Sequence, residues 1–202
     1  MPDDVIEIDA PELQALACRL EPLIEKAQAE EVRDPLDYLL GALHALFQAK
    51  RLRFKDRNHP LHGKSGDSPE GIEYWQYAAL KRVRRMSQGK LRVDGAWTAG
   101  FYFNSALTRI AAVFDRVVRR KARQRRLDQP PPGSRQSPSV KELLEALGLA
   151  ELRTRELIAV YDEVTPLKHK AIGLAKRRNV TMAVAIAGFG QMLDLLEHPK
   201  LQ

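Results

Sequence analysis

Hydrophobic residues recur at intervals of three and four along nearly the whole chain, a spacing that places them on one face of an α-helix. No run of alternating polar and hydrophobic residues indicates a strand. The fold class is therefore predicted as all-α, an antiparallel bundle of about six to eight helices joined by short connections. The predicted helices span residues 11–31, 34 to about 50, 70–87, 97–125, 139–147, 152–161, 165 onward and 180–196.

Capping residues and prolines mark the predicted starts of these helices. Asp9 is expected to cap the first helix, which has Pro11 in its first turn, and Asp34 with Pro35 is expected to open the second. The pair Thr165 and Pro166 is expected to open another helix in the same way.

The apolar stripe of each helix predicts which side chains are buried. Leu40 is assigned to the buried face of the second helix, and Phe101 to that of the long helix over 97–125. Cys18, the only cysteine, lies on an apolar helical pattern and is expected to be a small buried residue. His44 is expected in the core or at its boundary.

Residues 129–139, QPPPGSRQSPS, form the one clear linker, because adjacent prolines prevent a helix. We expect a single helical domain over 1–202, with 129–139 as an exposed crossover between 1–128 and 140–202. Ser139 and Glu142 then have the spacing of a capping box. The small residues of the last helix are compatible with a homodimer contact or with a central position in the bundle.

Charge is unevenly distributed along the chain, although the net charge is only +7. Residues 81–126 hold fourteen Lys or Arg against two Asp, a balance of +12, whereas the first 33 residues have a balance of −6. The acidic start contains no secretory signal, and no stretch is apolar and long enough to span a membrane. We therefore expect a cytoplasmic protein without a membrane partner.

Two basic clusters at predicted helix ends carry the main functional hypothesis. Such clusters bind nucleic-acid phosphates and release counterions, without choosing a sequence. The hypothesis is a non-catalytic module that binds RNA or DNA, alone or within a complex; an acidic protein partner, or pairing within the chain, is the alternative. The predicted binding residues are Lys81, Arg82, Arg84, Arg85, Arg116, Arg119, Arg120, Lys121, Arg123, Arg125 and Arg126.

The sequence lacks a Gly-rich phosphate loop, a Cys/His metal spacing and a nucleophile elbow, so no metal or cofactor is expected. One short motif points instead to an enzyme. Arg57-Asn-His-Pro-Leu-His62 reads Arg-Asn-x-x-x-His and resembles the motif of nucleases of the HEPN (higher eukaryote and prokaryote nucleotide-binding) superfamily. The resemblance implies a helical bundle that cleaves RNA without a metal. Arg57 would stabilise charge on the phosphate, and His62 would move a proton.

Residues 164–170, VTPLKHK, resemble a second HEPN-like pattern, an Asn-x-Leu-Lys-His turn that is expected at a helix entry. In this pattern Val164 stands where the family has Arg, and His169 becomes a further catalytic candidate. The alternative function implied by the resemblance is thus a metal-independent ribonuclease that uses His62 or His169.

Overall fold

The computed structural model describes residues 9–27, 30–55, 84, 87–89, 95–129, 137–169 and 180–198. Over these residues the chain forms six α-helices, one 3-10 helix and no strand, so the predicted all-α fold is confirmed. The elements are α1 (Pro11–Lys26), α2 (Glu30–Arg51), α4 (Gly95–Gln124), α5 (Val140–Ala146), the 3-10 helix η1 (Ala150–Thr154), α6 (Glu156–His169) and α7 (Met182–Glu197).

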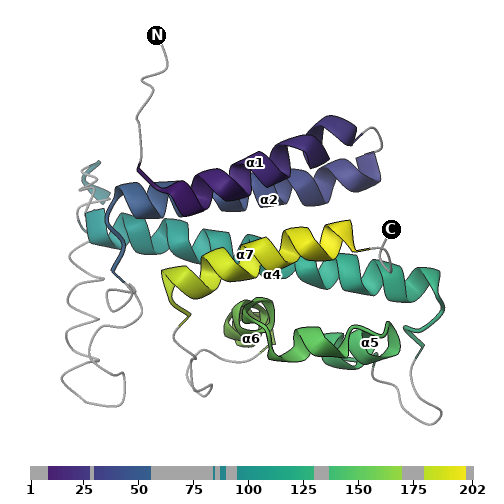
Figure 1. The fold of residues 1–202 in the computed structure, drawn as a ribbon. Coiled ribbons are helices and arrows are strands. Elements are labelled where there is room, and N and C mark those ends of the chain that lie inside the picture. Colours follow the sequence, from purple (N-terminus) through teal and green to yellow (C-terminus); the bar gives the residue numbers. More distant parts are fainter. Residues whose placement is uncertain are drawn as a thin grey trace.

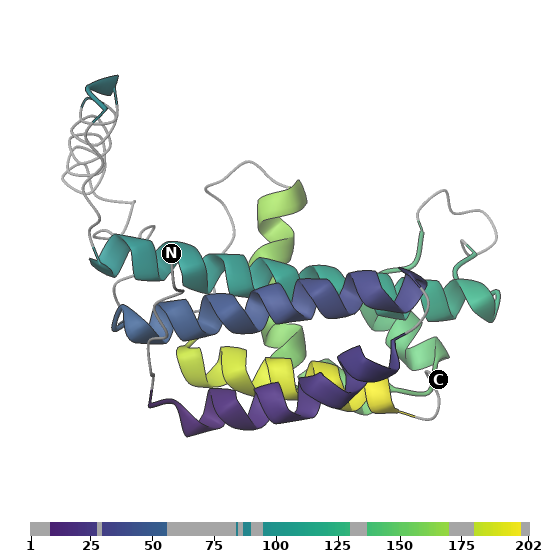
Figure 2. The same ribbon diagram turned by 90° about the horizontal axis from the view of Figure 1, so that it is seen from above.

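The long helix α4 lies at the centre of the bundle (Figure 1). The hairpin of α1 and α2 lies on one side of it, and α2 packs along most of its length. The helix α7 lies beside both α1 and α4, while α6 crosses α4 and packs against α7 (Figure 2). The short helix α5 packs against α4 near its C-terminal end, so elements from before and after residues 130–136 share one core.

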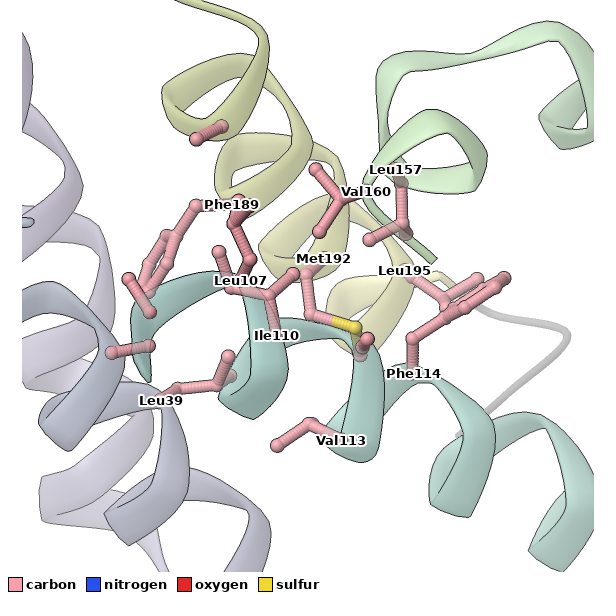
Figure 3. Close-up of a cluster of buried hydrophobic side chains, with 14 of the residues drawn as sticks. Leu39, Leu107, Ile110, Val113, Phe114, Leu157, Val160, Phe189, Met192 and Leu195 are labelled. Atoms are coloured by element: carbon pink, nitrogen blue, oxygen red, sulfur yellow. The ribbon is translucent and has the colours of Figure 1, made fainter. Parts of the chain in front are cut away.

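The core is continuous and purely apolar among the described residues (Figure 3). Phe114 of α4 meets Tyr161 of α6 edge to face, with ring centroids 5.5 Å apart. Gly188 of α7 allows close packing against α6, because a Cβ at this position would lie 3.1 Å from Val160 Cγ2 and 3.4 Å from Leu157 Cα. A larger residue at this position would push the two helices apart.

The predicted capping box at the start of α5 is confirmed. The backbone N–H of Glu142 donates to Ser139 Oγ at 3.3 Å, and the backbone N–H of Ser139 donates to Glu142 Oε2 at 2.6 Å. Gly148 ends this short helix with φ of +71°, a conformation in which glycine avoids a steric clash. At the start of α7, Thr181 Oγ1 accepts a hydrogen bond from the backbone N–H of Val184 at 3.3 Å.

Four predictions about helix ends are wrong. The first helix ends at Lys26 and the second begins at Glu30, so that Pro35 lies inside α2. Ala10 precedes α1, and no side chain caps that helix. Pro166 lies inside α6 instead of opening a helix, because packing of α6 against α4 and α7 outweighs the local cost of proline.

Several side chains predicted to be buried are exposed. Leu40 is 49% exposed, Phe101 is 58% exposed, and Cys18 lies at the surface. His44, expected in the core or at its boundary, is also exposed. The cause is the position of each helix. The helix α2 packs mainly against α1 and α4. Its apolar stripe is wider than the face that these two helices cover, so part of the stripe stays exposed. Cys18 lies two residues from buried Leu16, about 200° around the helix, and so faces away from the core.

Candidate anion-binding surface at the end of α4

The last turn of α4 closes with a left-handed residue. The backbone N–H of Leu127 donates to the carbonyl of Ala122 at 2.8 Å, and that of Arg126 donates to the carbonyl of Arg123 at 3.0 Å. Arg126 has φ of +59°. This pair of hydrogen bonds defines a Schellman motif, in which the left-handed position is usually glycine. Leu127 completes the motif by packing against the core.

Two other helices end in the same way, which allows a comparison. After α2 the left-handed residue is Arg53, with φ of +58°, and Phe54 N–H donates to the carbonyl of Ala49 at 2.9 Å. After α5 it is Gly148. A left-handed conformation costs an L-residue about 1–2 kcal/mol, a cost that glycine avoids. The chain therefore keeps arginine at two positions where the backbone favours glycine.

Carboxylates partly neutralise the basic end of α4. Arg116 Nη2 lies 3.2 Å from Asp34 Oδ2 of α2, and Arg123 Nε lies 3.4 Å from Asp128 Oδ2. Both arginines remain accessible, since 54% of the Arg116 side chain and 74% of the Arg123 side chain are exposed. Exposed pairs of this kind contribute about 1 kcal/mol or less, so an anionic ligand can replace the carboxylate at low cost.

Two hydrogen bonds hold the Arg119 side chain in place. Its Nε donates to Asp115 Oδ1 at 3.1 Å, and its Nη1 donates to the carbonyl of Pro138 at 3.2 Å. Tyr161 of α6 also donates its hydroxyl to Asp115 Oδ1, at 3.1 Å. Burial, together with the Asp115 charge, raises the pKa of the Tyr161 phenol. The network thus ties α4, α6 and the start of α5 together and fixes the direction of the Arg119 guanidinium.

Positive charge is concentrated at the basic end of α4. Residues 116–126 carry seven Lys or Arg and no Asp or Glu, and the ion pairs named above place three carboxylates beside them. Arg125 and Arg126 are exposed, while Arg120 and Lys121 are half-buried. These cations also interact favourably with the C-terminal end of the helix dipole.

The second predicted cluster is only partly described. Lys81, Arg82 and Arg85 lie outside the described residues, and Arg84 is exposed. The short described stretch 87–89 lies beyond the N-terminal end of α4, at the opposite end from residues 116–126 (Figures 1 and 2). The structure therefore brings together the cations within 116–126 and does not join them to the stretch 87–89.

The catalytic candidates are placed as follows. Arg57 and His62 lie outside the described residues. His169 is the last residue of α6, and its side chain is not among those described. The prediction that 164–170 forms a turn at a helix entry is wrong, because Val164 to His169 are the last residues of α6. The turn on which the second HEPN-like resemblance depends is therefore absent from this part of the described chain.

Sequence reasoning missed one organised cation, Arg109 in the middle of α4. Its guanidinium carbon lies 5.4 Å from the ring centroid of Tyr38, and its Nε donates to Ser105 Oγ at 3.4 Å. A Cβ at Gly41 would lie 2.6 Å from its Nη1, so the guanidinium is seated directly on the backbone of α2. Gly41, an isolated glycine within an apolar helical pattern, was the available signal of a close approach.

Two further findings concern the described residues as a whole. None of their helices combines the length and the apolar character needed to cross a membrane. They also contain no group of three or more His, Cys, Asp or Glu side chains placed to hold a metal ion. In comparisons with protein-family models, with curated proteins and with solved structures, the chain matches none of them.

Proposed function

We propose that this protein is a non-catalytic module that binds the backbone of nucleic acid through the basic end of α4. The observation that supports the proposal is the concentration of seven Lys or Arg within residues 116–126, on a surface where Arg123, Arg125 and Arg126 are exposed. Phosphate oxygens accept paired hydrogen bonds from a guanidinium, which favours arginine over lysine for this contact.

The backbone geometry of Arg126 supports the same surface. A left-handed arginine costs folding free energy that glycine would not cost. Strained residues of this kind concentrate at functional sites, and of the two left-handed arginines described above only Arg126 lies in the basic end of α4. The seating of Arg119 by Asp115 and by the Pro138 carbonyl adds a pre-oriented donor, so less side-chain entropy is lost when a phosphate binds.

The experiment is a fluorescence-anisotropy titration of labelled oligonucleotides at several salt concentrations. If four of these seven cations contact phosphates, the logarithm of the binding constant falls with the logarithm of the salt concentration with a slope of about −3 for a single strand. Affinity then falls about fifty-fold between roughly 50 and 200 mM salt. RNA recovered from the mixture stays intact, as a non-catalytic module requires.

A matched pair of triple variants tests the location of the site. Arg123, Arg125 and Arg126 changed together to Gln remove three charges from the end of α4. Changing three exposed cations at the end of α2 to Gln removes the same charge from the opposite end of the α2–α4 pair: Arg51, Arg53 and Lys55. We expect the first variant to lose most of the salt-dependent affinity and the second to retain it. Absent binding, a flat salt response or equal losses in both variants would contradict the proposal.

An acidic protein segment is the second candidate ligand. One observation favours it: Arg116 and Arg123 already form ion pairs with carboxylates of the same chain. Polyglutamate of matched charge, titrated under the same conditions, separates the two classes. Tighter binding of polyglutamate than of the oligonucleotides would replace nucleic acid by an acidic polypeptide as the partner.

A further inference from the structure

Arg109 is seated unlike the other arginines of α4. Its guanidinium carbon lies over the Tyr38 ring, 5.4 Å from the centroid, and its Nη1 lies so close to Gly41 that a side chain there would displace it. The Ser105 hydroxyl accepts from its Nε at 3.4 Å. These three contacts come from two helices and restrict the position of the guanidinium before any ligand arrives.

Arg109 also differs from its neighbours in its described ion pairs. Within the described part of the chain no carboxylate forms an ion pair with Arg109, whereas Arg116, Arg119 and Arg123 each have one. A guanidinium has five N–H donors, and the Ser105 contact uses one of them. The guanidinium of Arg109 is half-buried and has N–H donors that the Ser105 contact does not use. Such a cation can bind two oxygens of a phosphate group.

Arg109 continues the basic surface toward the middle of the bundle. Arg109, Arg116 and Arg123 are spaced by seven residues, which on an α-helix places them along one side at intervals of about 10 Å. The first two lie beside α2, where Arg109 meets Tyr38 and Arg116 pairs with Asp34. The arginines thus form a row that runs along the α2–α4 pair.

An aromatic ring stands beside this row. Tyr38 is 50% exposed, and Arg109 occupies a position over its ring. A half-exposed tyrosine next to a row of arginines provides what unpaired bases need, a stacking surface beside phosphate contacts. Bases within a duplex are already stacked on each other and cannot use such a ring, so this arrangement favours a single strand.

We propose that Arg109 and Tyr38 form a binding point for single-stranded nucleic acid, with Arg109 on a phosphate and Tyr38 stacked on the adjacent base. The strand then follows the arginine row from the middle of α4 to its basic end. This inference rests on the proposed function, which it extends by naming the form of nucleic acid and a second point of contact. Gly41 acts as a positioning residue, because its missing side chain leaves room for the Arg109 guanidinium.

The test uses the full chain and labelled single-stranded RNA and DNA, together with the corresponding duplexes. Arg109→Gln is expected to weaken single-strand binding about tenfold and to reduce the salt slope by about 0.7, the value for one phosphate contact. Tyr38→Leu is expected to weaken it about fivefold or more without changing the salt slope, since stacking carries no charge. Arg155→Gln, which removes an exposed charge between η1 and α6, is the matched control and is expected to bind as the wild type does.

Gly41→Ala is the decisive variant, because it leaves the net charge unchanged. The new methyl group displaces the flexible end of Arg109, so thermal unfolding is expected at or above the wild-type temperature while single-strand affinity falls as in Arg109→Gln. Wild-type affinity in Gly41→Ala and Arg109→Gln, with the salt response of the wild type intact, would overturn this inference and leave the proposed function standing. Equal or tighter binding of duplexes would also overturn it. Failure of the wild type to bind any oligonucleotide would overturn both proposals.

Discussion

Replacement of Arg126 by glycine separates the stability of the fold from its proposed function. Arg126 adopts φ of +59° at the end of α4. Releasing the left-handed strain favours the folded state by about 1–2 kcal/mol. Glycine also makes the unfolded chain more flexible, which offsets about 0.4–1 kcal/mol. The net expectation is a gain of roughly 1 kcal/mol, which raises the midpoint of thermal unfolding by about 2–4 °C for a chain of this size.

The same substitution should weaken binding. If Arg126 contacts a phosphate, Arg126→Gly reduces the slope of the salt dependence by about 0.7–0.9. Stability is measured by circular dichroism on heating, and affinity by anisotropy. Arg53→Gly is the matched control, because Arg53 has φ of +58° and its replacement causes the same loss of charge at the end of α2. We expect the control to gain similar stability and to keep its affinity.

Two results would refute this reasoning. If both glycine variants unfold at lower temperature than the wild type, the left-handed conformation is not a source of strain at these positions. If Arg126→Gly is stabilised but binds with unchanged affinity and salt slope, the strained arginine does not contact the ligand, and the backbone argument for the site fails. Loss of affinity in Arg53→Gly as well would point to an effect of net charge alone.

Three further predictions concern the scaffold that positions this surface. Gly188→Ala is expected to destabilise the protein by about 1 kcal/mol in a urea titration, since its Cβ would lie 3.1 Å from Val160 Cγ2, whereas Gly190→Ala has room and should be neutral or stabilising. Ser139→Ala removes the capping box and should lower the free energy of unfolding by about 1 kcal/mol in the same titration. An unchanged midpoint would mean that the capping box does not stabilise the protein. The folded state stabilises the neutral phenol of Tyr161, so its pKa lies above the ordinary value of 10.0. The resulting contribution to folding stability is fully present below pH 10.0 and is lost as the pH rises through the raised pKa. Tyr161→Phe should therefore make alkaline unfolding less steep, and an identical pH profile would argue against the shift.

Much of the fold follows from residues close together in the sequence. Helical periodicity, the Ser139 capping box and the Gly148 helix end each depend on positions within about one or two turns, and all are visible in the chain itself. The basic end of α4 is of the same kind, because its charges lie within eleven consecutive residues, 116–126. Local rules failed at Pro166, where packing of α6 keeps a proline inside the helix.

Only the tertiary structure decided which faces are covered and which charges are compensated. Leu40 and Phe101 belong to apolar helical patterns, yet each is exposed in the folded bundle. Arg116 pairs with Asp34, and Arg109 lies over the ring of Tyr38. Both contacts join residues that are distant in sequence. Helical periodicity indicates that a helix has an apolar side, but the position and width of the covered face depend on the neighbouring helices. The basic end of α4 was therefore predictable, whereas the partners and orientation of its arginines required the fold.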